Sequence, residues 1–169
     1  TSGKTTTTSL CAAMLKEQGL TVFTGGNIGT PLSEYILSGE KADVVVLELS
    51  SFQLQTCSTL HPRVGILLNI SENHLDFHKD MEDYCDAKGK LFGICDTGCV
   101  NADDPWTPRL IKNATCRLMC YSTKSATDLT AEHIALHSDG VEFDAVSGGE
   151  RAHVRLGIPG AFTVYNALG

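Results

Sequence analysis

The sequence predicts a three-layer α/β domain with a mainly parallel sheet and a small antiparallel β meander near the C-terminus. Short apolar runs, such as residues 44–47 and 64–68, alternate along the chain with stretches of helical spacing. This alternation is typical of parallel strands that are buried on both faces and joined by helices. After residue 130 the pattern changes to an alternation of apolar and polar residues, which half-buried antiparallel strands show.

The helices and strands are expected in the following order. Residues 5–18 form a helix, because their apolar side chains recur at roughly helical spacing. Residues 20–24 form a strand that Gly25-Gly26 ends, and residues 30–38 form a short helix with Pro31 in its first turn. The remaining expected elements are strands at 44–47, 64–68, 117–121 and one ending at 99–101, and helices at 80–92, 104–112 and after residue 160.

The expected meander occupies residues 132–156. Its apolar residues alternate with polar ones on either side of two turn signals, Asp139-Gly140 and Gly148-Gly149, which are typical of hairpins. The alternating pairs are Ile134 and Leu136, Val141 and Phe143, and Val154 and Leu156.

Composition limits the possible classes of protein. A chain of 169 residues with 42% hydrophobic content is long enough for one domain with a full core. A formal charge of −7 without a basic block argues against a nucleic-acid partner, and no apolar run approaches the roughly 20 residues of a membrane span. Seven cysteines without a CxxC pair indicate buried thiols in a reducing compartment. We therefore expect a cytoplasmic protein without a signal peptide.

The first chemical signal is Gly3-Lys4-Thr5-Thr6, which matches the second half of a phosphate-binding loop. In such a loop, backbone N–H groups surround the phosphates at a helix N-terminus, the lysine reaches the β- and γ-phosphates, and the next hydroxyl ligates magnesium. The expected helix follows these residues, but the glycine that opens such a loop does not precede them. Taken alone, a chance Gly-Lys-Thr in a polar segment explains them equally well.

Polar side chains also follow both apolar runs. Glu48 comes directly after residues 44–47, where a Walker B strand offers a carboxylate to magnesium, although a solvated strand-end glutamate has the same pattern. His74 follows residues 64–68, and Lys88 lies in the next helical stretch; by default they are a structural histidine and a solvated lysine. Because the carboxyl ends of parallel strands meet at one edge of a sheet, loop, acid and histidine together predict a site for a nucleotide and magnesium.

Taken together, these segments resemble the central, ATP-binding domain of the Mur ligases, the ATP-dependent enzymes that add amino acids in peptidoglycan synthesis. The resemblance implies a P-loop-type fold. Ser2 replaces an Asn of the family loop, and Thr163 replaces an Asn of the last motif. The matching segments occur in the family order over the whole chain and are Thr1–Thr6, Glu48–Ser51, Asn73–Asp76, Tyr84–Lys88 and Gly160–Ala167.

The resemblance implies a role for each matching residue. Residues that would hold the phosphates of ATP are Thr1, Ser2, Gly3, Lys4, Thr5 and Thr6, and Asn166 would lie on the adenine side. Ligands of the magnesium between the β- and γ-phosphates would be Thr5 and Glu48, and those of a second magnesium would be His74 and a carbamylated Lys88. The catalytic set would be Lys4, Glu48, His74 and Lys88, and Asn27 and Ser50 would contact a UDP-sugar substrate.

The implied reaction has two steps. A carboxylate of the UDP-sugar substrate attacks the γ-phosphate to give an acyl phosphate and ADP, and the amine of an amino acid then displaces phosphate. The family also has an N-terminal UDP-binding domain and a C-terminal amino-acid-binding domain, and neither is among these 169 residues. The chain is therefore expected to be a fragment that is inactive alone.

Two segments, 25–32 and 48–54, resemble the branch of the family that adds D-glutamate. Ser50-Ser51-Phe52-Gln53 stands where the diamino-acid-adding ligases typically carry Ser-Ser-His. The alternatives that stay open are a ligase for a diamino acid or L-alanine, a folylpolyglutamate synthase, a non-catalytic P-loop module, and an α/β domain without a site.

Overall fold

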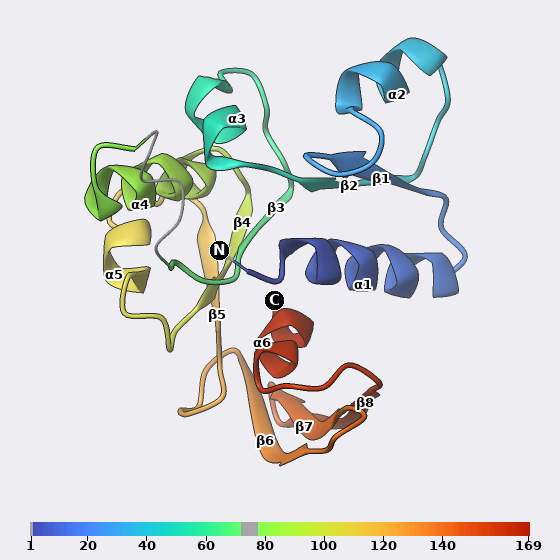
Figure 1. Cartoon of the computed structure of the whole chain (residues 1–169), viewed down its shortest axis with the longest axis vertical. Coiled ribbons are helices and arrows are strands. Elements are labelled where there is room, and N and C mark those ends of the chain that lie inside the picture. Colours follow the sequence, from blue (N-terminus) through green and yellow to red (C-terminus); the bar gives the residue numbers. More distant parts are fainter. Residues whose placement is uncertain (1, 72–77) are drawn as a thin grey trace.

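The computed structural model of the chain describes residues 2–71 and 78–169, and its strands form two sheets (Figure 1). The smaller sheet pairs β1 (Val22–Gly26) with β2 (Val44–Glu48) in parallel. The larger sheet has six strands in sequential order. They are β3 (Val64–Leu67), β4 (Thr97–Asn101), β5 (Arg117–Ser122), β6 (Leu129–Leu136), β7 (Val141–Ser147) and β8 (Glu150–Leu156).

Helices lie against both sheets. They are α1 (Lys4–Glu17), α2 (Leu32–Ser38), α3 (Ser51–Thr56), α4 (Met81–Gly89), the 3₁₀ helix η1 (Lys90–Gly93), α5 (Thr107–Leu110) and α6 (Phe162–Leu168). In Figure 1, α4 and α5 lie on one side of β4 and β5, and α1 and α6 lie on the other. Two successive residues of β3 illustrate this, because Gly65 lies against Leu91 of η1 and Ile66 lies against Gly169, which follows α6. The predicted three-layer α/β fold is confirmed.

The meander is confirmed as an antiparallel unit, but it continues the main sheet. Strands β3, β4, β5 and β6 pair in parallel, and β6, β7 and β8 pair in antiparallel. The join between the two parts is narrow, because β5 and β6 are in register only at Tyr121 with Leu129 and at Ser122 with Thr130.

The core divides at the larger sheet. One cluster packs α4, η1 and α5 onto β3 and β4, and the other packs α6 onto β5, β6 and β7. The first contains Leu67, Ile70, Tyr84, Cys85, Phe92, Cys95, Val100 and Leu110. The second contains Tyr121, Ala131, Val141, Phe143, Val164 and Leu168. The first cluster includes Leu67 and Val100, so part of the core lies at the carboxyl ends of β3 and β4.

Gly25-Gly26 was expected to end the first strand, and this was wrong. Both glycines belong to β1, because neighbouring backbones pass too close for a side chain. A Cβ on Gly25 would lie 2.2 Å from the carbonyl oxygen of Thr30, and one on Gly26 would lie 2.5 Å from that of Glu48. The two glycines thus allow neighbouring backbone segments to pass close to β1, and the strand continues until Gly26 pairs with Glu48.

The expected helices at 80–92 and 104–112 are shorter in the structure. The first ends at Gly89 and continues as the tighter η1, at a point where a Cβ on Gly89 would lie 2.8 Å from the carbonyl oxygen of Leu110. The second is reduced to α5, Thr107–Leu110. The sequence reading also missed α3, which begins with a capping box between Ser50 and Gln53.

Candidate active site

The phosphate-loop residues lie at the start of α1, as predicted. Gly3 precedes the helix with φ of +89°, a conformation that glycine adopts without the strain of a side chain. A Cβ at Gly3 would also meet Asn166 of α6, whose Oδ1 is 2.0 Å from that position. Lys4, Thr5 and Thr6 then form the first turn, so their side chains lie beside exposed N–H groups of a helix N-terminus.

Glu48 lies at the end of β2 and faces this turn. Only 4% of its surface is exposed, so the carboxylate is stabilised by the donors around it. The hydroxyl of Thr5 donates to its Oε2 at 2.7 Å, and the Nδ2 of Asn27 donates to its Oε1 at 3.0 Å. Lys4 Nζ lies 3.9 Å from the same Oε1. Four predicted site residues from three separate segments therefore meet around one buried carboxylate.

The Thr5 hydroxyl and the Glu48 carboxylate fit a magnesium ion. They are two hard oxygen donors side by side at a helix N-terminus, which is the donor type that magnesium takes together with phosphate oxygens and water. Within residues 2–71 and 78–169 there is no group of three or more His, Cys, Asp or Glu side chains placed to hold a metal. Such an ion would thus need oxygens from a bound nucleotide to complete its shell.

Lys88 of α4 is buried next to these groups. Its exposed fraction is 5%, and its Nζ lies 5.1 Å from the centre of the Tyr84 ring. The pKa of Lys88 is lowered to about 8, mainly by burial and also by the positive charge of Lys4, while the charge of Glu48 opposes both effects. The amine is thus largely protonated at neutral pH, with a neutral fraction far larger than that of an exposed lysine.

Two further amides complete the surroundings of the loop. Asn69, directly after β3, accepts from the N–H of Ser2 at 3.0 Å and donates to its carbonyl oxygen at 2.9 Å. The carbonyl oxygen of Asn166 accepts from the hydroxyl of Thr7 at 2.8 Å, while its side-chain Nδ2 is buried and has no hydrogen-bond partner among the described residues. An unpartnered donor beside Gly3 is available to a ligand in the loop. The sequence signal for Asn69 was its position as the first polar residue after the apolar run 64–68.

Ser50 is placed beside this centre, but its side chain has another role. It caps α3, where its Oγ accepts from the backbone N–H of Gln53 and its own N–H donates to the Gln53 side chain. The predicted contacts of Ser50 and Asn27 with a UDP-sugar stay predictions. The predicted site residues Thr1 and His74 lie outside the described residues.

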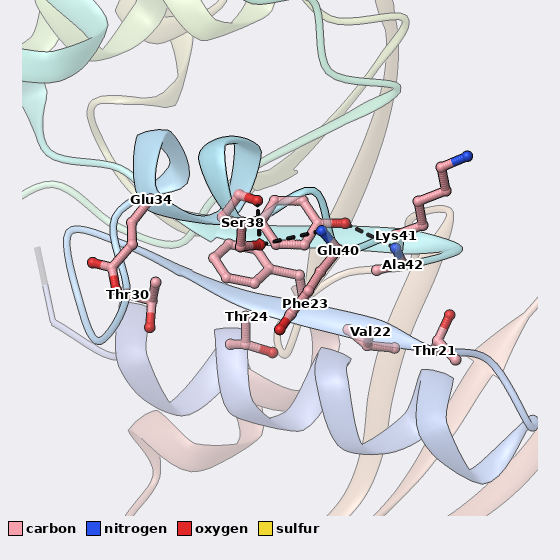
Figure 2. Close-up of a pocket in the computed structure, with 11 residues that line it drawn as sticks. Thr21, Val22, Phe23, Thr24, Thr30, Glu34, Ser38, Glu40, Lys41 and Ala42 are labelled. Carbon is pink, nitrogen blue, oxygen red and sulfur yellow. Dashed lines mark hydrogen bonds between the residues drawn. The ribbon is translucent and has the colours of Figure 1, made fainter.

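The structure also contains a groove of about 500 Å³ beside β1 and α2 (Figure 2). It is lined by Thr21, Phe23, Thr30, Glu34, Ser38 and Lys41, among others. None of the predicted site residues lines it, and the ring of Tyr35 stacks on Phe23 there at 4.1 Å. The groove is therefore distinct from the centre around Glu48 and Lys88.

A family model described as the Mur ligase middle domain matches residues 1–169. The chain belongs to this family. The Mur ligase domain is 74% identical over 98 residues to a protein from Desulfovibrio desulfuricans named UDP-N-acetylmuramoylalanine–D-glutamate ligase, a match that covers 58% of the domain and 23% of that protein. A protein of the same name from Thermoanaerobacter pseudethanolicus is 38% identical over 174 aligned positions, which cover 99% of the domain and 37% of that protein.

Solved structures of Mur ligases share the fold. A UDP-N-acetylmuramoyl-L-alanyl-D-glutamate–2,6-diaminopimelate ligase is 25% identical with a TM-score of 0.83, over 99% of this domain and 40% of that chain. A MurF ligase from Thermotoga maritima, solved in complex with ADP, is 23% identical with a TM-score of 0.81, over 99% of this domain and 42% of that chain. This Mur ligase domain thus spans well under half the length of the relatives that it matches. Among its described residues, no helix is long and apolar enough to cross a membrane.

Proposed function

We propose that the protein containing this domain is the ATP-dependent ligase that joins D-glutamate to UDP-N-acetylmuramoyl-L-alanine. The observation that carries the proposal is the meeting of Lys4 and Thr5 with the buried Glu48 next to the buried Lys88, which combines a phosphate-loop turn with a lysine of lowered pKa. The names of the relatives from Desulfovibrio and Thermoanaerobacter support D-glutamate as the added amino acid. Ser50-Ser51-Phe52-Gln53 supports the same branch.

In the proposed reaction, each site residue has a role that follows from its position. The N–H groups that follow Gly3 and the ammonium group of Lys4 bind the phosphates of ATP and hold the γ-phosphate in line with the incoming carboxylate. Thr5 and Glu48 would hold magnesium, which neutralises the charge of the phosphate oxygens that it contacts. With the repulsion between carboxylate and triphosphate reduced, the substrate carboxylate can attack to form the acyl phosphate.

Lys88 supplies the second charged group of the proposed site. Its neutral amine attacks CO₂: the N–C bond forms as one C=O π bond opens, the electron pair of that bond moves to oxygen, and the nitrogen releases a proton to solvent to give a carbamate. This converts a cation next to Lys4 into an anion that Lys4 attracts. The carbamate oxygens, together with the predicted ligand His74, would hold a second magnesium. Burial of Lys88 favours the neutral, reactive form of the amine that this step requires.

The test uses the full-length enzyme and a coupled assay for ADP release. Activity with D-glutamate, and not with meso-diaminopimelate or L-lysine, is the expected result; turnover with a diamino acid would contradict the proposed branch. Lys88→Ala should lose activity, and millimolar formate, which supplies a free carboxylate, should restore part of it. Full activity of Lys88→Ala without formate would contradict the role of Lys88, and absence of ligation by the wild-type enzyme would favour a nucleotide-binding module.

A further inference from the structure

His78 is buried between α3 and α4 and is bonded at both ring nitrogens. Only 1% of its surface is exposed. Its Nε2 lies 2.9 Å from the Oγ of Ser51, the first residue of α3, and its Nδ1 lies 3.2 Å from the Oδ2 of Asp83, in the first turn of α4. An ionised carboxylate only accepts, so Nδ1–H donates to Asp83. In the neutral imidazole, Nε2 then accepts the hydroxyl proton of Ser51.

The order of hydroxyl, imidazole and carboxylate is that of a nucleophile with its base. The burial of Ser51 argues against such a role, because its exposed fraction is 2% and no substrate atom reaches the hydroxyl. Neither does His78 belong to the set around Glu48. The hydrogen-bonded chain instead fixes the start of α3 to the start of α4.

Ring contacts extend this connection toward Lys88. His78 lies parallel to Phe52 of α3, with ring centres 5.8 Å apart and planes 6° apart. The ring centres of His78 and Tyr84 of α4 are 5.1 Å apart. The centre of the Tyr84 ring in turn lies 5.1 Å from the Nζ of Lys88. Tyr84 is fully buried, so a displacement of His78 has no empty space to absorb it.

We propose that Ser51, His78 and Asp83 form a positioning unit: their hydrogen bonds hold α3 and α4 together and so fix the distance between Lys88 of α4 and the residues between Glu48 and α3. Ser51 orients α3 directly after that segment, and His78 supports the Tyr84 wall against which the Lys88 amine lies. His78 is thus a positioning residue that touches no reacting atom. The inference rests on the proposed function, because the position of Lys88 affects the rate only if Lys88 takes part in the ligase reaction.

The test compares variants of the full-length enzyme in the ADP-release assay, with melting temperature measured in parallel. His78→Phe keeps a ring and removes both hydrogen bonds, and Ser51→Ala removes one oxygen atom and keeps the imidazole. We expect each to lower kcat about tenfold with KM for ATP within about twofold of wild type, because small displacements of positioned groups cost rate. The double variant should be no worse than His78→Phe, since both changes break the same bond.

Two further variants separate positioning from general stability. His78→Gln places an amide at the Nε2 position and should recover at least half of the kcat lost in His78→Phe. His61→Phe is the matched control, because the exposed His61 lies elsewhere in the domain, with its Nε2 at 2.8 Å from the Oδ1 of Asp96, and it should leave kcat unchanged.

Wild-type kcat in both Ser51→Ala and His78→Phe, independent and multiplying losses in the double variant, or a lowered melting temperature with unchanged kcat would each overturn the inference. Absence of ligation by the wild-type enzyme would instead contradict the proposed function, so the two failures are distinguishable.

Discussion

Replacing Lys88 with methionine removes a buried positive charge while it keeps a side chain of similar length. The pKa of Lys88 falls from its ordinary 10.5 to about 8 in the folded chain. Since one pKa unit corresponds to about 1.4 kcal/mol, folding with the charged amine costs on the order of 3 kcal/mol. The lost contact with the Tyr84 ring offsets about 0.5–1 kcal/mol of this. Lys88→Met should therefore stabilise the 169-residue chain by about 2–3 kcal/mol at pH 7.

The pH dependence gives this prediction a sign. Below pH 8 the amine is protonated in both the folded and the unfolded chain, so the full cost is present. Between pH 8 and 10.5 the folded chain releases the proton first, the unfolded chain binds more protons, and wild-type stability rises relative to the variant. The advantage of Lys88→Met should thus shrink steadily over this range and nearly vanish above it.

Urea unfolding of both chains in CO₂-free buffer, at intervals from pH 7 to 10.5, measures the difference directly. Titration of all other groups cancels in the comparison of the two curves. A Lys88→Met chain that is less stable than wild type at pH 7, or a difference that does not change with pH, would refute the reasoning that burial without compensation lowers this pKa.

Three more predictions concern the loop and the core. Gly3→Ala should weaken ATP binding in the full-length enzyme at least tenfold. The control is Gly19→Ala: Gly19 also has positive φ, but a Cβ there meets nothing within 4 Å, so the change should cost only about 1 kcal/mol of stability and leave ATP affinity unchanged. Calorimetric titration with ATP distinguishes the two variants. Lys4→Met should raise the pKa of Lys88, because it removes a charge that lowers it, and NMR of isotope-labelled lysine reports this value. Phe92→Ala should destabilise the domain by about 3–5 kcal/mol in urea unfolding, since Phe92 is fully buried; a loss below about 1 kcal/mol would contradict its place in the core.

Apolar periodicity was a good guide to the fold, because both the parallel strands and the meander bury alternating or continuous apolar runs. It failed where backbones approach each other. Gly25 and Gly26 looked like a break, and only the neighbouring carbonyl oxygens of Thr30 and Glu48 explain why glycine continues that strand. The contact of Gly26 depends on Glu48 of the neighbouring strand, which is distant in sequence, so no local pattern contains it.

Residue types at strand ends predicted the centre around Glu48, because carboxyl ends of parallel strands converge on one edge. They did not predict His78, which lies four positions after the predicted ligand His74 and just before the expected helix at 80–92. Its importance comes from burial between two short helices, and one of these, α3, was itself not predicted. A sequence signal existed in the capping pattern Ser50-x-x-Gln53.

The contact between Gly3 and Asn166 joins the two ends of the domain in space. This contact and the hydrogen bond from Thr7 to the Asn166 carbonyl join residues that are separated by almost the whole sequence. Bringing such distant residues together costs conformational entropy, so these contacts are expected to form slowly during folding. On a ribosome, the residues of the loop leave the exit tunnel before α6 does, so they wait for α6 before their final surroundings exist. Nucleotide binding should therefore be among the last properties that a nascent chain acquires, and ATP would recognise only chains whose translation has passed this helix.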